Sequence, residues 1–170
     1  CQARLKHYFV GEGSETLVVD AVMNGRDTDG KLEADNVWAT EKRLNTLKAF
    51  MRKEDFTENA QVLKRMTNIL AKAEHSLSCA YDASLLENEA EKELDKGIKA
   101  FSEVFDTNFA NNNFMPVMDA MAKLRPLVDA FFESVMVMAE DKNVRQNRMN
   151  MLFAVMSRMN RMADFANLQI

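Results

Sequence analysis

Apolar residues recur at intervals of three and four along almost the whole chain, which is the spacing of one face of an α-helix. Glycine and proline are rare, with 5 and 2 residues among 170, so long helices with short connections are expected. No segment shows the alternation of a half-buried strand. We therefore predict an all-α bundle of about seven helices. The helical segments are expected near residues 2–10, 17–23, 32–51, 55–73, 85–105, 115–124, 126–138 and 142–163.

The densest apolar run follows Pro126, a residue that suits the first turn of a helix better than its interior. Leu127, Phe131, Val135 and Met138 recur at helical spacing, and so do Val128, Phe132 and Met136. The two rows together form a wide apolar face. We predict a core helix here, in which Phe131 and Phe132 have a structural role.

The last predicted helix, residues 142–163, carries five positive charges and no acidic residue. Glu140 and Asp141 precede it and can cap it. Its predicted apolar stripe consists of Leu152, Val155, Met156 and Met159. Arg145 and Arg148 project onto that stripe, where an unpaired charge would be costly, so we expect both to be structural and paired with acids from elsewhere. Arg158 and Arg161 project onto the opposite, polar face and are candidates for contact with RNA.

A second basic face is predicted on the helix at residues 56–73. Its members are polar side chains that lie opposite or beside the apolar stripe of the helix, and they are Gln61, Lys64, Arg65, Asn68 and Lys72. An ordinary solvated face is the simpler interpretation of such a pattern. The functional interpretation is an RNA surface, because Lys and Arg hold phosphates while Asn and Gln read base edges.

Acidic residues also cluster, from Glu87 to Asp95. They alternate at every second position, which does not place them on one helix face, so we expect a solvated surface and not a metal site. Asp55 and Glu58 have the spacing of a capping box and predict a helix start at that point.

The composition of the chain limits the classes of function that it can have. The net charge of −4 disfavours a general nucleic-acid binder such as a DNA-binding protein, so any RNA contact must come from a local basic face. Two cysteines without metal-ligand spacing favour a cytoplasmic setting, and no apolar run predicts a membrane span or signal peptide. No nucleophile–base pair, phosphate-binding loop or metal motif is present. We therefore predict no active site and no cofactor in this chain.

Several motifs carry a resemblance to a known family. VDAFFESVMVMAED at Val128–Asp141 is followed by RQNRMNML at Arg145–Leu152, and LKRMTNILAK occupies Leu63–Lys72. With RLKHYF, LVVDAVMNG and the ending ADFANLQI, these segments resemble the C-terminal helical domain of the bacterial glycyl-tRNA synthetase β subunit over essentially the whole chain. Glu133 stands where the family usually has Asp, and Met149 and Met156 stand where Leu is usual; these swaps are similar in volume and leave the fold expectation intact.

The resemblance implies an anticodon-binding domain of the DALR type, with helices at residues 1–55 preceding a bundle at 56–170. It implies tRNA-Gly, the α subunit and the rest of the β subunit as partners. The α subunit would hold the site for glycine, ATP and Mg²⁺, so the complete enzyme is a ligase while this chain recognises tRNA. It also implies a piece of a longer chain that begins before Cys1 and ends at the natural C-terminus.

Two alternatives stay open. The bundle can be a protein–protein docking scaffold within the synthetase, which should expose an apolar patch. It can also be the related domain of arginyl-tRNA synthetase.

Overall fold

The computed structural model describes residues 2–13 and 15–168, with the side chain of Asp35 left out, and confirms an all-α fold. Within these ranges there is no β-strand beyond a single bridge between Arg26 and Leu32. The expectations about the two chain ends concern Cys1 and residues 169–170, which lie outside the described residues. The helices are α1 (Gln2–Gly11), α2 (Thr16–Met23), η1 (Glu33–Asp35), α3 (Val37–Met51), α4 (Phe56–Leu70), η2 (Ala83–Leu85), α5 (Glu89–Phe109), α6 (Met115–Ser134), α7 (Lys142–Met162) and η3 (Phe165–Asn167).

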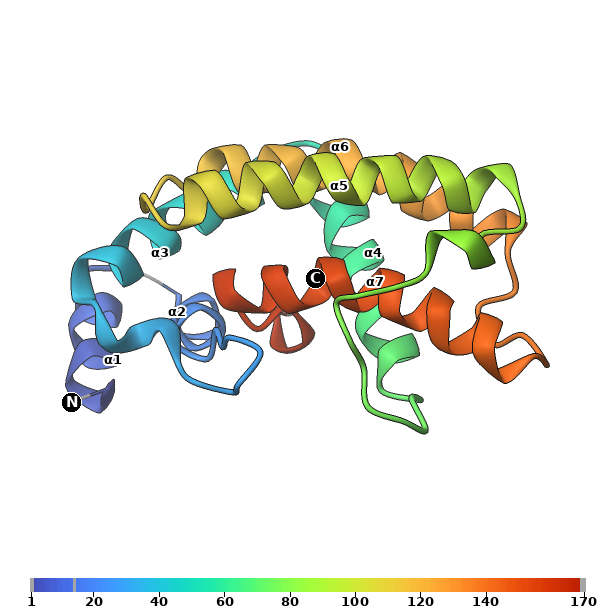
Figure 1. The fold of residues 1–170 in the computed structure, drawn as a ribbon. Coiled ribbons are helices and arrows are strands. Elements are labelled where there is room, and N and C mark those ends of the chain that lie inside the picture. Colours follow the sequence, from blue (N-terminus) through green and yellow to red (C-terminus); the bar gives the residue numbers. More distant parts are fainter. Residues whose placement is uncertain (1, 14, 169–170) are drawn as a thin grey trace.

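The two long helices α5 and α6 run side by side along one edge of the molecule, and a short loop makes them antiparallel (Figure 1). The loop turns at Asn112, whose φ of 54° is left-handed. Gly97 lets the helices approach closely, because a Cβ there would lie 2.6 Å from Leu127 Cδ1 and 2.8 Å from Leu124 Cδ1. This pair forms the platform on which the other helices pack.

Helix α7 crosses beneath the platform and packs against both α4 and α5 (Figure 1). Its predicted stripe of Leu152, Val155, Met156 and Met159 is fully buried, which confirms that part of the sequence analysis. The side chain of Asp141 caps α7 by accepting hydrogen bonds from the backbone N–H groups of Asn143 and Val144. One continuous hydrophobic cluster joins these helices to α1, α2 and α3.

The N-terminal helices are tied to the end of α7 by a buried arginine. Arg43 on α3 is 1% exposed and donates hydrogen bonds to the carbonyl oxygens of Arg161 (2.6 Å) and Glu33 (2.8 Å). Gly25 passes so close to this contact that a Cβ would lie 2.7 Å from the Arg161 carbonyl oxygen. No role for Arg43 was predicted from the sequence, although the residue falls on the apolar stripe of its helix with Leu47 and Phe50.

The predicted helix break at Pro126 is wrong, because α6 runs through it from Met115 to Ser134. Pro126 is exposed, so the carbonyl that loses its helical partner can be solvated, while buried residues before and after it, such as Met121 and Val128, hold the helix together.

The predicted continuation of this helix beyond Ser134 is also wrong. Val135 and Val137 are buried, whereas Met136 and Met138 are exposed. The helix ends because Val135 adopts an extended backbone (φ −127°, ψ 130°), which β-branched residues favour, and Val137 and Met138 then form a turn. Met136 and Met138 are therefore not part of the core helix face.

The acidic run is not wholly solvated as expected. Glu91 is 0% exposed and Asp95 is buried, because both have partners on other segments. The capping box predicted from Asp55 and Glu58 is absent, since the Asp55 side chain makes no capping hydrogen bond. A capping box forms instead at the start of α5, between Asn88 and Glu91.

Candidate nucleic-acid interface

The polar side of α4 and the turn that follows it form an open basic surface, which we call the α4 face. Its residues are Gln61, Lys64, Arg65 and Asn68 on the helix and Lys72 in the turn after Leu70, although Lys72 was predicted to lie within the helix. Opposite it, Val62, Leu63 and Met66 are buried and fix the rotation of the helix. Lys64 is half-buried, and the other four residues are exposed. Within the described part of the chain, the polar side-chain groups of these five residues make no hydrogen bond or ion pair to the protein.

Arg65 lies over an aromatic ring. Its Cζ atom is 4.1 Å from the ring centroid of Phe132, in the last turn of α6. Phe132 is buried and packs against Phe131, with ring centroids 5.8 Å apart. The two phenylalanines predicted as core residues thus lie in the core, and one of them also supports a surface guanidinium.

The α4 face continues towards the start of α7. Lys72 lines one small cleft together with Lys142 and Arg145, and Met138 and Met149 supply apolar walls. Arg145 forms an ion pair with the exposed Glu74 at 3.6 Å. Three cations therefore converge at the junction of α4 and α7.

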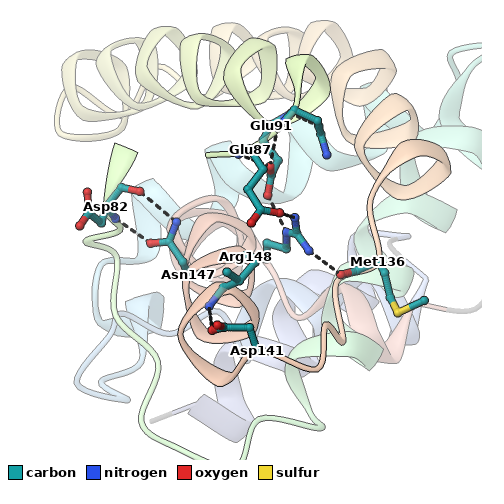
Figure 2. A network of polar contacts seen from close by, with 9 residues as sticks. Asp82, Glu87, Glu91, Met136, Asp141, Asn147 and Arg148 are labelled. Atoms are coloured by element: carbon teal, nitrogen blue, oxygen red, sulfur yellow. Dashed lines mark hydrogen bonds and ion pairs between the residues drawn. The ribbon is translucent and has the colours of Figure 1, made fainter. Parts of the chain in front are cut away.

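The non-helical segment after α6 is positioned by a buried arginine of α7 (Figure 2). Arg148 Nε donates to Glu91 Oε1 (2.5 Å), and Nη2 donates to Glu87 Oε2 (3.0 Å). Its Nη1 donates to the backbone oxygen of Met136 (3.0 Å). Arg148 thereby joins α7, the start of α5 and the segment that follows Phe132.

Glu91 is held ionised by this network. Burial alone would raise its pKa, but hydrogen bonds from Arg148 and from the backbone N–H groups of Asn88 and Glu87 outweigh burial, and the pKa is lowered from the usual 4.5. An ionised Glu91 supplies the counter-charge for Arg148.

Met136 presents an exposed apolar side chain beside this network. It is 71% exposed, and its side chain points away from Arg148 (Figure 2). Since Phe132 lies under Arg65 and Met138 lines the cleft with Lys72, the segment between them connects two parts of the α4 face.

The other candidate arginines have acidic partners. Arg158 forms an ion pair with Asp106 of α5 at 3.3 Å and donates to the carbonyl oxygen of Ala154. Arg161 Nε donates to Glu33 Oε1 (2.5 Å), and its Cζ lies 4.3 Å from the ring centroid of Phe109. The structure therefore does not bring these two arginines together with the α4 face.

Amide side chains of α7 pin the connection between α4 and α5. Asn147 accepts a hydrogen bond from the backbone N–H of Asp82 (2.7 Å) and donates one to its carbonyl oxygen (3.0 Å). Gln146 donates to the carbonyl oxygen of Ser76, and Asn150 accepts from the N–H of Ser78. The polar side of α7 is thus largely covered by this connection.

The described residues contain no group of three or more His, Cys, Asp or Glu side chains arranged to hold a metal ion. No helix in the described ranges has the length and apolar character needed to cross a membrane.

In a comparison with known protein families, the family model for the DALR anticodon binding domain matches residues 60–166. That range contains α5, α6, α7 and most of α4, including the whole α4 face.

Curated relatives cover almost the whole chain. A glycine–tRNA ligase beta subunit of Oleidesulfovibrio alaskensis is 39% identical over 98% of this chain and 24% of its own length. The corresponding proteins of Solidesulfovibrio magneticus and Vibrio campbellii are 40% and 32% identical, over 24% and 23% of their lengths. This chain thus spans about a quarter of the length of these relatives.

Proposed function

The chain belongs to the DALR anticodon-binding domain family, and we propose that it binds the anticodon loop of a tRNA through the α4 face. The observation that carries this proposal is the set of polar side chains on α4 and in the turn after it that have no hydrogen-bond or ion-pair partner in the described ranges. Phosphates suit Lys64 and Lys72, and the amides of Gln61 and Asn68 can pair with base edges. An anticodon loop offers unpaired bases for such contacts.

The names of the relatives suggest which tRNA this is. Each of the three is called a glycine–tRNA ligase beta subunit, which favours tRNA-Gly over the arginine tRNA of the alternative. In this proposal the chain supports ATP-dependent charging of tRNA-Gly in the cytoplasm. Glycine, ATP and Mg²⁺ bind in the α subunit, which is a partner together with the rest of the β subunit.

The arginines of α7 have mainly structural roles in this proposal. Arg148 has a buried acidic partner, and Arg158 and Arg161 pair with acids on other elements. In this proposal all three arginines hold the bundle together, and the α4 face makes the contact with RNA. Arg145 is mainly structural through Glu74, although it borders the cleft at Lys72.

Residues 1–55 support a second role, which is docking to the remainder of a longer protein. Val37 and Trp38 are 51% and 55% exposed at the start of α3, and Tyr8 and Leu17 are exposed on α1 and α2. Exposed apolar side chains of this size are typical of contact surfaces. We therefore assign docking to residues 1–55 and RNA contact to the bundle at 56–170.

The RNA proposal is tested by fluorescence anisotropy with a labelled tRNA-Gly anticodon stem-loop, titrated with the 170-residue chain at two salt concentrations. Replacing Lys64 and Lys72 together by glutamine should weaken binding and reduce the slope of log K against log salt by about 1.4, at about 0.7 per phosphate contact. A stem-loop with exchanged anticodon bases should bind more weakly to the unaltered chain.

The matched control replaces Lys31 and Lys123, both exposed and distant from α4 in sequence, by glutamine. It makes the same change in net charge and should leave the slope unchanged. Equal losses in the two double variants would contradict the α4 face as the binding surface. Absence of binding at low salt would contradict the RNA proposal as a whole.

A further inference from the structure

Arg65 differs from the arginines of α7 in having a ring and no acid as its partner. We infer that one unpaired RNA base stacks on the outer side of the Arg65 guanidinium, with Phe132 supporting the inner side. This inference rests on the proposed function and deepens it, because it names the contact that a base makes.

The support beneath Arg65 is rigid. Phe132 is buried, and its ring packs against the fully buried Phe131. With Cζ 4.1 Å from the ring centroid, the guanidinium lies over the Phe132 ring. Arg65 as a whole is exposed, so a ligand can reach its side chain from solvent. A planar cation held in this way is a surface on which a base can stack.

Arg161 provides a comparison within the same molecule, because its guanidinium lies over a ring and also has an acidic partner. It also lies over a phenylalanine, with Cζ 4.3 Å from the ring of Phe109. Its Nε, however, donates to Glu33 at 2.5 Å, so its charge is neutralised within the protein. Arg65 has no such partner among the described residues and keeps its charge and its donors for a ligand.

The neighbours of Arg65 suit a base in that position. Gln61 lies four residues before Arg65 and Asn68 three residues after it, so both are adjacent on the helix surface. Their amides can donate to and accept from the edge of a stacked base. Lys64 and Lys72 can hold the flanking phosphates.

Lysine cannot replace arginine in this role, because an ammonium group is a compact point charge without a plane. The test therefore compares Arg65→Lys with the matched variant Arg161→Lys. The probe is a tRNA-Gly anticodon stem-loop with 2-aminopurine at one anticodon position at a time. Quenching of 2-aminopurine fluorescence reports stacking, and anisotropy reports affinity.

The unaltered chain should quench 2-aminopurine at one anticodon position. Arg65→Lys should abolish that quenching and weaken binding by at least about fivefold, the lower end of the loss expected for one stacked base. The salt dependence should stay the same because the charge is kept. Arg161→Lys should preserve both quenching and affinity.

A linear RNA with the loop sequence distinguishes the sources of the base. Quenching on the linear RNA as well means that any unpaired base is accepted, whereas quenching on the stem-loop alone means that the loop presents it. Both results support stacking. Salt-sensitive binding with undiminished quenching in Arg65→Lys would overturn the stacking site and leave the proposed function standing. Absence of binding by the unaltered chain would overturn both.

Discussion

Replacing Arg148 by methionine is expected to lower the free energy of unfolding by about 3–5 kcal/mol, the largest effect of any single substitution considered for this chain. The reason is that the buried acid Glu91 would lose its positively charged partner. Glu91 is 0% exposed and would keep its charge without a counter-ion, and the carbonyl oxygen of Met136 would lose its donor. Urea denaturation followed by circular dichroism measures the change.

Two controls separate this cost from the general effect of losing a positive charge. Arg145→Met removes a partner of the exposed Glu74 and should cost less than about 1 kcal/mol. The double variant Arg148→Met with Glu91→Gln should recover part of the loss, because no buried charge remains. Equal costs for Arg148→Met and Arg145→Met would show that the buried pair is not a centre of stability.

The loss in Arg148→Met should also depend on pH. The pKa of Glu91 is lowered from 4.5 in the folded protein, so its contribution to stability is complete above pH 4.5 and is lost as the pH falls through the folded pKa. Protonated Glu91 needs no counter-charge. The difference in stability between the unaltered chain and Arg148→Met should therefore shrink as the pH falls below the usual glutamate pKa of 4.5.

Replacing Arg43 by leucine is expected to lower the free energy of unfolding by about 2–4 kcal/mol, because two partly buried carbonyl oxygens lose their donors. These oxygens belong to Arg161 at the end of α7 and to Glu33 in η1. Burial lowers the pKa of Arg43 to about 10, partly offset by the nearby Glu33, so the guanidinium stays charged at neutral pH. The expected loss in the free energy of unfolding therefore comes from the lost hydrogen bonds, and denaturant unfolding measures it.

Lys42→Met is the matched control for Arg43→Leu on the same helix. Lys42 lies over the exposed Trp38 ring at 3.9 Å, an interaction that contributes only about 0.5–1 kcal/mol at an exposed site. A cost for Arg43→Leu that does not exceed that of Lys42→Met would contradict the role of Arg43 in joining α3 to α7.

Helical periodicity was enough to predict the fold class and the buried faces of α4 and α7. These faces follow from spacing alone, since Leu63, Met66, Leu152 and Val155 recur on one side of a helix. The inward projection of Arg148 was visible for the same reason. Local patterns suffice where one helix face decides burial.

Periodicity failed where distant residues decide the structure. Glu91 is buried because Arg148 reaches it across 57 positions of sequence, and no local pattern shows that contact. Pro126 stays within α6 because residues of the helix before it and after it, such as Met121 and Val128, are buried. The non-helical segment at Val135–Met138 is fixed partly by the hydrogen bond from Arg148 to the backbone oxygen of Met136.

The candidate interface could be predicted only in outline. Helical spacing placed five polar residues on one side of a single helix. Gln61, Lys64, Arg65 and Asn68 do lie on α4, whereas Lys72 lies in the turn after it, and none of the five has a hydrogen-bond or ion-pair partner in the described part of the chain. Helical spacing could not show that Arg65 would lie over Phe132, or that Arg158 and Arg161 would meet Asp106 and Glu33, because each of these contacts joins different helices.

The central claim is that RNA contacts the α4 face, and chemical footprinting of lysines tests it most directly. The chain is treated with an amine-reactive acetylating reagent, with and without the tRNA-Gly anticodon stem-loop, and each lysine is followed by mass spectrometry. The stem-loop should protect Lys64 and Lys72 and leave the exposed Lys31 and Lys123 unchanged. Protection of Lys31 or Lys123, with Lys64 and Lys72 still reactive, would contradict the claim.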